Sequence, residues 1–252
     1  MEFPVYLWLG PLPIHPHLFF ESLAYAIAFR LVLLNSRKDT IAPSQRSSVI
    51  VGGMVGALVG AKVLVLLQHI DVIWSSWECL LLLLLQGKTV VGALLGGLIG
   101  VELTKKMIGV KQSTGDAFVY PLIVGTAVGR IGCFLTGLSD RTYGIATTLP
   151  WGVDFGDGIP RHPTQLYEII FLLGLILFLK IRSRYHRQEG DLFKFYMIAY
   201  LSFRLLIDFI KPDFHPILGL SGIQIACVLG LLYYYRSIPT MFALTRSAKI
   251  IP

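Results

Sequence analysis

Charged residues are scarce in this chain. Only 15% of its 252 residues are charged, whereas 54% are hydrophobic. A soluble domain usually carries about 25% charged residues, so the composition excludes an ordinary soluble domain and indicates an integral membrane protein. The net charge of +7 does not indicate a nucleic-acid-binding protein, because most of the basic residues lie in short loops beside apolar segments.

Cysteine is also scarce, and a signal peptide is not evident. Cys79, Cys133 and Cys227 are far apart and form neither a metal-binding pattern nor a disulfide framework. The first residues include no basic region, and no small-residue cleavage site follows the first apolar run, so we expect this run to be retained. The chain has no internal repeat and no low-complexity linker, and residues 1–252 are expected to form a single domain.

Long apolar segments dominate what remains. A hydrocarbon core of about 30 Å requires roughly 20 apolar residues per helix. We therefore predict an all-α membrane protein with about seven transmembrane helices. These helices are expected at 17–35, 49–67, 89–104, 115–136, 164–181, 192–210 and 217–235. Residues 79–85 are too short to cross and are expected to form an interfacial or re-entrant piece.

The loops predict an orientation. Basic residues gather after the first, third and fifth segments and in the C-terminal tail, and include Arg37, Lys38, Arg46, Lys105, Lys106, Lys111, Arg182, Arg184, Arg187, Lys194, Arg236, Arg246 and Lys249. By the positive-inside rule the N-terminus is outside and the C-terminus is cytoplasmic. The loop between the fourth and fifth helices then faces the periplasm or the cell exterior.

Glycines recur at close spacing in the second to fourth segments. Examples are Gly56 with Gly60, Gly92 with Gly96, and Gly125 with Gly129. Small residues four apart allow helix backbones to approach closely in lipid. The pattern predicts tight packing of these three helices, with room for an acyl chain as the alternative.

Arg130 lies inside the fourth segment between Gly129 and Gly132. An arginine at membrane depth is costly and usually faces a cavity or a partner. Snorkelling to the interface is the alternative. A second arginine, Arg161, opens the next segment, and two arginines near one membrane surface indicate a ligand with a phosphate, which guanidinium binds with two hydrogen bonds.

Residues 161–168 begin the fifth segment and carry several polar groups. Arg161, Gln165 and Glu168 are spaced to share one helical face. Glu168 lies one turn inside the helix, where the helix dipole favours a negative charge. His162 is either a helix-entry residue or a contact for ligand or proton.

Two further groups could carry chemistry. Arg204 and Asp208 are four apart, and form either an intrahelical pair or an arginine that points into a cavity with Asp208 orienting it or taking a proton. His15, His17 and Glu21 begin the first segment. They could bind a metal, although a third and fourth ligand are not evident; a polar interface patch and proton transfer are the other interpretations.

These residues resemble the prolipoprotein diacylglyceryl transferases. The resemblance covers nearly the whole chain, and its motifs are Leu9-Gly10-Pro11, Gly129-Arg130-Ile131-Gly132 with Phe134, residues 161–168, and Phe203-Arg204 with Asp208-Phe209. It implies a multi-pass protein of the bacterial inner membrane, with its active site toward the periplasm. The implied reaction moves a diacylglyceryl group from phosphatidylglycerol to a prolipoprotein cysteine, without a metal or organic cofactor.

The chain also departs from the family pattern. Leu95 stands where the family has a histidine, and Cys133, Thr136 and Leu138 stand at the positions of two asparagines and a glutamate. His17 aligns with a family tyrosine. The phosphate-binding arginines are therefore retained, whereas several groups that handle protons are not.

The resemblance implies roles for the retained residues. Arg130 and Arg204, with Arg161, would hold the phosphodiester and stabilise charge on the leaving group. The base would be His17 or His162, and Asp208 or Glu168 would orient an arginine. Further substrate-binding positions are Gln165, Gly129 and Gly132. The alternatives are a transferase with a different acceptor, a non-catalytic lipid-binding or scaffold protein, and a small transporter.

Overall fold

The computed structural model describes residues 2–35, 41–69, 77–183, 189–212 and 219–239, and most of them are helical. The predicted basic residues Arg37, Lys38, Arg184, Arg187, Arg246 and Lys249 lie outside the described residues. The helices are α1 (Pro16–Asn35), α2 (Pro43–Gln68), α4 (Trp77–Gln86), α5 (Val90–Ile108), α6 (Val119–Thr136), α7 (Thr164–Arg182), α8 (Asp191–Ile207) and α9 (Gly222–Tyr233), with short 3-10 turns at Gly115–Phe118, Gly137–Asp140 and Asp208–Ile210.

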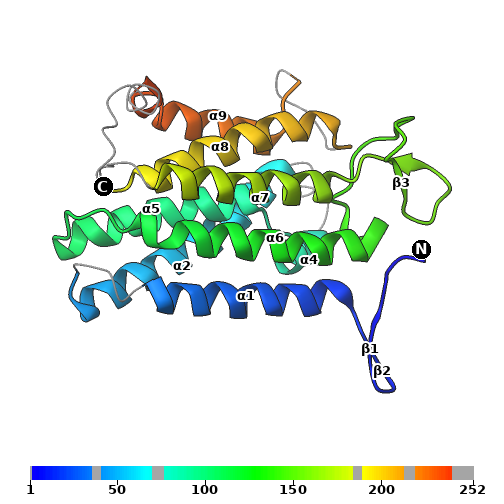
Figure 1. Cartoon of the computed structure of the whole chain (residues 1–252), viewed down its shortest axis with the longest axis horizontal. Coiled ribbons are helices and arrows are strands. Elements are labelled where there is room, and N and C mark those ends of the chain that lie inside the picture. Colours follow the sequence, from blue (N-terminus) through cyan, green and yellow to red (C-terminus); the bar gives the residue numbers. More distant parts are fainter. Residues whose placement is uncertain (1, 36–40, 70–76, 184–188, 213–218, 240–252) are drawn as a thin grey trace.

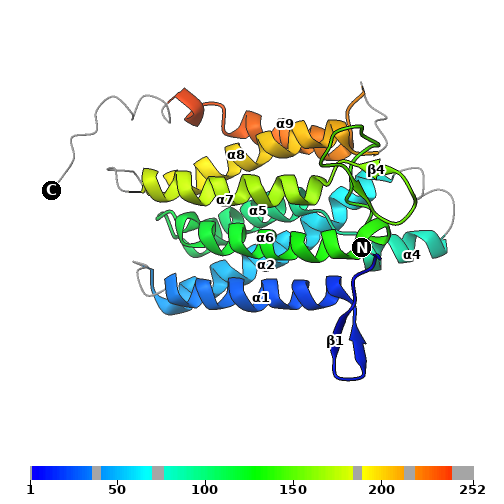
Figure 2. The same ribbon diagram turned by 45° about the vertical axis from the view of Figure 1, so that its right-hand side comes forward.

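The long helices lie side by side in one bundle (Figures 1 and 2). Two small antiparallel hairpins, β1 (Leu7–Leu9) with β2 (Leu12–Ile14) and β3 (Val153–Asp154) with β4 (Pro160–Arg161), lie at one end of it. We call this the hairpin end. The starts of α1 and α7 and the ends of α6 and α8 meet there, at the right of Figure 1.

Four described helical stretches are long and apolar enough to cross a membrane. They are Pro16–Leu34, Pro43–Gln68, Gly115–Asp140 and Thr164–Arg182. The protein is thus an all-α membrane protein with multiple candidate spans, as the composition predicted. The predicted third, sixth and seventh segments overlap α5, α8 and α9, which are shorter than these four stretches or carry more charge. The apolar run at 79–85 lies in the ten-residue helix α4.

Glycines set the closest helix contact of the bundle, between α2 and α5. A Cβ atom at Gly56 would lie 2.3 Å from the carbonyl oxygen of Gly96, and one at Gly60 would lie 2.3 Å from that of Gly92. This is the predicted close packing of the second and third segments. The fourth segment differs, because Gly125 in α6 faces α1, where its Cβ would lie 3.3 Å from that of Ala28.

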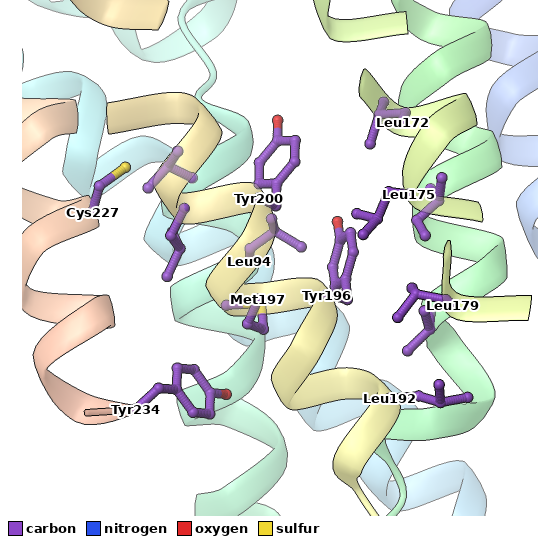
Figure 3. Close-up of a cluster of buried hydrophobic side chains, with 14 of the residues drawn as sticks. Leu94, Leu172, Leu175, Leu179, Leu192, Tyr196, Met197, Tyr200, Cys227 and Tyr234 are labelled. Atoms are coloured by element: carbon purple, nitrogen blue, oxygen red, sulfur yellow. The ribbon is translucent and has the colours of Figure 1, made fainter. Parts of the chain in front are cut away.

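The apolar core lies mainly between α7, α8 and the helices beside them. Leu172, Leu175 and Leu179 of α7 face Tyr196 and Tyr200 of α8 (Figure 3). The two tyrosine rings stack with their centroids 5.9 Å apart. This core fixes the position of α8 relative to α7, and hence of the polar groups at the hairpin end of both helices.

Candidate active site

Arg130 does not extend toward a surface but pairs with a carboxylate on the next helix. Its Nε lies 2.9 Å from Oε2 of Glu168, which α7 supplies. Arg130 is 8% exposed and Glu168 only 2%. Breaking such a buried ion pair leaves an uncompensated charge, so each residue depends strongly on the other.

Arg204 reaches the same carboxylate from α8. Its Nη1 lies 3.4 Å from Oε2 of Glu168, and its Nη2 lies 3.5 Å from Oδ1 of Asp208. The Tyr200 hydroxyl donates to Oε1 of Glu168 over 2.7 Å. Arg204 therefore makes the intrahelical pair with Asp208 and also an interhelical contact. We call Arg130, Glu168, Tyr200, Arg204 and Asp208 the arginine network.

The start of α9 is attached to this network. The Ser221 hydroxyl donates to Asp208, and it also accepts from the backbone N–H of Gln224 in a capping box. The Gln224 side chain donates in turn to the carbonyl oxygen of Leu205 over 3.3 Å. Because a capping box fixes the first turn of a helix, α9 holds Asp208 beside Arg204.

Lys211 adds a third cation that we did not predict from the sequence. It follows α8 and is 9% exposed. Burial, together with the charges of Arg204 and Arg130, lowers the pKa of its ammonium group to about 7. The sequence offered only a weak signal for it, a lysine seven residues after Arg204 in a loop with few other basic residues.

The arginine network retains donors for a ligand. Within the described part of the chain, Nε of Arg204 is buried and has no hydrogen-bond partner. Beside Arg130, a Cβ atom at Gly129 would meet no atom within 4 Å, so the backbone there faces open space. An unpaired buried N–H is costly, and an anionic oxygen would satisfy it.

A second polar group gathers around His17 at the start of α1. Its Nδ1 lies 3.0 Å from Oδ1 of Asp140, and its Nε2 lies 3.4 Å from Oε2 of Glu21. The Thr142 hydroxyl donates to Asp140 over 2.5 Å. Glu21 also accepts from the Lys88 ammonium group and from the Tyr25 hydroxyl. Both nitrogens of His17 therefore face a carboxylate.

Cys133 joins this group to the arginine network. Nη1 of Arg130 donates to Sγ of Cys133 over 3.7 Å. Ligand atoms of His17, Cys133 and Asp140 all lie within 4.8 Å of one another. We call His17, Glu21, Cys133 and Asp140 the histidine cluster. A cavity of about 550 Å³ adjoins it and is lined by His15, His17, Leu18, Glu21, Thr136, Ser139 and Asp140.

Gln165, another predicted site residue of the segment 161–168, lies beside these groups. The Gln165 amide donates to the Thr142 hydroxyl over 3.1 Å, and Thr142 in turn contacts Asp140. Gln165 is 1% exposed, and within the described residues its Oε1 has no hydrogen-bond partner. It thus lies between the histidine cluster and Glu168, which is one turn further along α7.

His162 and Arg161 make other contacts. Nδ1 of His162 lies 3.1 Å from the Tyr167 hydroxyl. Arg161 pairs with Asp157 over 2.6 Å and covers the ring of Tyr143. The hydrogen bond from Arg161 lowers the pKa of the exposed Asp157 carboxyl. These contacts belong to the loop, and neither side chain joins the described contacts of Glu168.

Gly132, Thr136 and Leu95 make contacts that pack the helices or satisfy the backbone. A Cβ atom at Gly132 would lie 2.8 Å from that of Phe20, so this glycine allows α1 to approach α6 beside His17. The Thr136 hydroxyl donates to the carbonyl oxygen of Gly132 over 2.7 Å. Leu95 packs against the apolar core near Gly230. The leucine side chain cannot transfer a proton as the family histidine at this position could.

Apolar helices around a buried polar site with several basic side chains define a helical membrane protein. The chain belongs to the prolipoprotein diacylglyceryl transferase family, whose model matches residues 4–242. This confirms the resemblance found in the sequence motifs.

Relatives from three bacteria support the assignment. The chain is 32% identical to the phosphatidylglycerol–prolipoprotein diacylglyceryl transferase of Bordetella parapertussis, with 83% of each chain covered. It is 30% identical to the transferase of that name from Desulfotalea psychrophila, with 92% of each covered. For the Clostridium tetani transferase the identity is 33%, over 76% of this chain and 79% of the relative.

Proposed function

We propose that this chain transfers a diacylglyceryl group from phosphatidylglycerol to the cysteine thiol of a prolipoprotein. Its relatives are named for this reaction, and this chain matches them over most of their length. The observation that carries the proposal for this chain is the convergence of Arg130 and Arg204 on Glu168 inside the bundle. Two guanidinium groups held in fixed positions are suited to a phosphodiester.

The charge of the site fits this donor. Arg130, Arg204 and a protonated Lys211 stand against Glu168 and Asp208, which leaves one positive charge. A phosphodiester carries a single negative charge. Glu168 would keep the two guanidinium groups apart and oriented, and the phosphate oxygens would bind their free N–H groups, including Nε of Arg204.

The chemistry that follows is a substitution at carbon. The acceptor thiolate attacks the glycerol carbon that bears the phosphate, a carbon–sulfur bond forms, and the carbon–oxygen bond to the phosphate breaks. Glycerol phosphate leaves with the bond electrons and takes up the proton that the thiol releases. Arg130 and Arg204 would stabilise the charge that develops on the leaving oxygen.

The acceptor side is assigned to the histidine cluster. His17 is joined to Arg130 through Cys133, whereas His162 contacts Tyr167 in the loop. The thiolate is the reactive form of a cysteine. We therefore favour the histidine cluster over His162 as the place where the acceptor thiol loses its proton.

The proposal includes a topology. Seven membrane-crossing helices, an outside N-terminus and a cytoplasmic C-terminus would place the hairpin end and both polar groups at the periplasmic side of the bacterial inner membrane. The clustering of Lys105, Lys106 and Arg182 at helix ends opposite to Arg130 and Glu168 supports this orientation. Accessibility of single introduced cysteines at Ser139 and Ser183 to an impermeant thiol reagent would test it.

One experiment tests the function. The purified protein is given phosphatidylglycerol labelled in its diacylglyceryl part, together with a peptide that carries a lipobox cysteine or the same peptide with serine. We expect label on the cysteine peptide alone. Arg130→Ala should abolish the transfer, while Arg182→Ala, at the opposite end of the bundle, should retain it. Phospholipid binding without transfer to the cysteine peptide would overturn the proposal.

A further inference from the structure

The histidine cluster brings together an imidazole, a thiol and a carboxylate, and all three groups can bind a metal ion. The proposed transfer does not use the three as a set. His17 comes from α1, Cys133 from α6 and Asp140 from the turn after α6. Their ligand atoms lie within 4.8 Å of one another. In a tetrahedral zinc site the bond lengths place neighbouring ligand atoms roughly 3.3–3.8 Å apart. Small rotations of these side chains would close the set around one ion.

We propose that His17, Cys133 and Asp140 bind a zinc ion whose fourth position receives the acceptor thiol. The sequence did not predict this set. Its cysteines form no metal-binding pattern, further ligands for His15, His17 and Glu21 were not evident, and the family reaction implies no metal. Zinc accepts imidazole nitrogen, thiolate sulfur and carboxylate oxygen together, whereas magnesium and calcium prefer oxygen ligands.

The surroundings of the three ligands resemble those of a metal site. Nε2 of His17 lies 3.4 Å from Glu21, so Nδ1 is left toward Asp140 and the ion, and a carboxylate holds the far side of the ring. The Thr142 hydroxyl fixes the second oxygen of Asp140. A thiolate and a carboxylate would also neutralise the two charges of Zn²⁺, which matters beside the Arg130 guanidinium.

Three protein ligands leave one position open, which is typical of catalytic rather than structural zinc. The cavity of about 550 Å³ adjoins His17 and Asp140, so a peptide thiol has space to reach this position. The arginine network is close to the same ligands, because Nη1 of Arg130 lies 3.7 Å from Sγ of Cys133. The proposed metal site and the proposed site of the donor phosphate are therefore neighbours.

The role of this ion rests on the proposed function. A zinc ion held by these residues would favour the thiolate form of a thiol at its fourth position, so the acceptor would lose its proton without a histidine base. The proton would pass to solvent and be recovered by the glycerol phosphate product. His17 would then be a ligand and not the base. This would compensate for Leu95 at the position of the family histidine.

Metal content tests the site independently of the reaction. The protein is purified with an affinity tag that lacks histidine, dialysed against zinc and analysed by mass spectrometry. We expect about one zinc ion per chain, as for a single three-ligand site. His17→Asn and Cys133→Ser should each lose it, and the matched control His15→Asn should retain it.

Cobalt reports on the sulfur ligand directly. After exchange of zinc for Co²⁺, we expect the sulfur-to-cobalt charge-transfer absorption and tetrahedral visible bands. They should persist in the Cys79→Ala/Cys227→Ala protein, in which Cys133 is the remaining thiol, and disappear in Cys133→Ser. The site would be overturned if the wild-type protein binds no zinc, shows no such absorption with Co²⁺ and has a Cys133 that is freely alkylated.

Transfer assays then separate the two proposals. Removal of zinc with a chelator should reduce transfer at least tenfold, and added zinc should restore it. Full activity of the metal-free protein would overturn the role of zinc and leave the transferase proposal standing. Stoichiometric zinc without any transfer, with phospholipid still bound, would overturn the proposed function and leave the metal site standing.

Discussion

Nε of Arg130 lies 2.9 Å from Oε2 of Glu168, and this contact joins α6 to α7 inside the bundle. The same oxygen lies 3.4 Å from Nη1 of Arg204. One carboxylate thus positions two arginines from helices that are far apart in the sequence. The donor site that we propose depends on this shared contact.

Glu168→Gln should destabilise the protein strongly. The substitution keeps the side-chain shape but leaves Arg130 and Arg204 buried without their negative partner, a change that costs about 3–5 kcal/mol in buried pairs. Tyr200→Phe removes only the hydrogen bond to Glu168 and should cost about 1 kcal/mol. Unfolding of the detergent-solubilised variants by urea or heat would measure both losses of stability. Equal stabilities of Glu168→Gln and Tyr200→Phe would contradict the shared-carboxylate interpretation.

Arg204→Lys should fold but transfer poorly. A lysine keeps the charge yet cannot contact Glu168, Asp208 and a phosphate oxygen with one planar group. We expect kcat to fall by about 10²–10³-fold, the usual effect of removing one donor to a developing oxyanion. Arg182→Lys, at the other end of the bundle, is the control. Wild-type turnover in Arg204→Lys would remove Arg204 from donor binding.

Lys211 should make stability depend on pH. Its ordinary pKa is 10.5 and burial lowers it to about 7 in the folded protein. Between these values the unfolded chain binds more protons than the folded one, so the free energy of unfolding should rise as the pH increases from about 7 to 10.5, and this contribution should be constant below about 7. Lys211→Met should lose this dependence, as measured by unfolding at several pH values. An unchanged slope in Lys211→Met would assign the effect to other groups.

Gly96→Ala should separate α2 from α5. The new methyl group would lie 2.3 Å from the carbonyl oxygen of Gly56, a contact that neither backbone can relieve locally. Overpacking of this kind costs about 1–3 kcal/mol. The neighbouring Gly97→Ala is a matched control, because its Cβ would lie 3.4 Å from the nearest atom. Thermal unfolding should show a clear loss for Gly96→Ala alone, and equal losses would argue against the close contact.

Much of the architecture follows from local sequence. Apolar segments of sufficient length predicted helices at the observed places, and the motifs around Arg130 and residues 161–168 indicated the family that the chain matches. The pairing of Arg204 with Asp208 was also open to prediction, since residues four apart lie on one face of a helix. These features depend on residues close together in the chain.

Only the tertiary structure identified the partners across helices. The contact between Arg130 and Glu168, the approach of Lys211, and the meeting of His17, Cys133 and Asp140 each join residues from separate elements. Helical periodicity gives the face on which a side chain lies, but not the depth or rotation of the helix beside it. Packing decides these, through the glycine contacts of α2 with α5, the approach of α1 at Gly132 and the tyrosine core of α8.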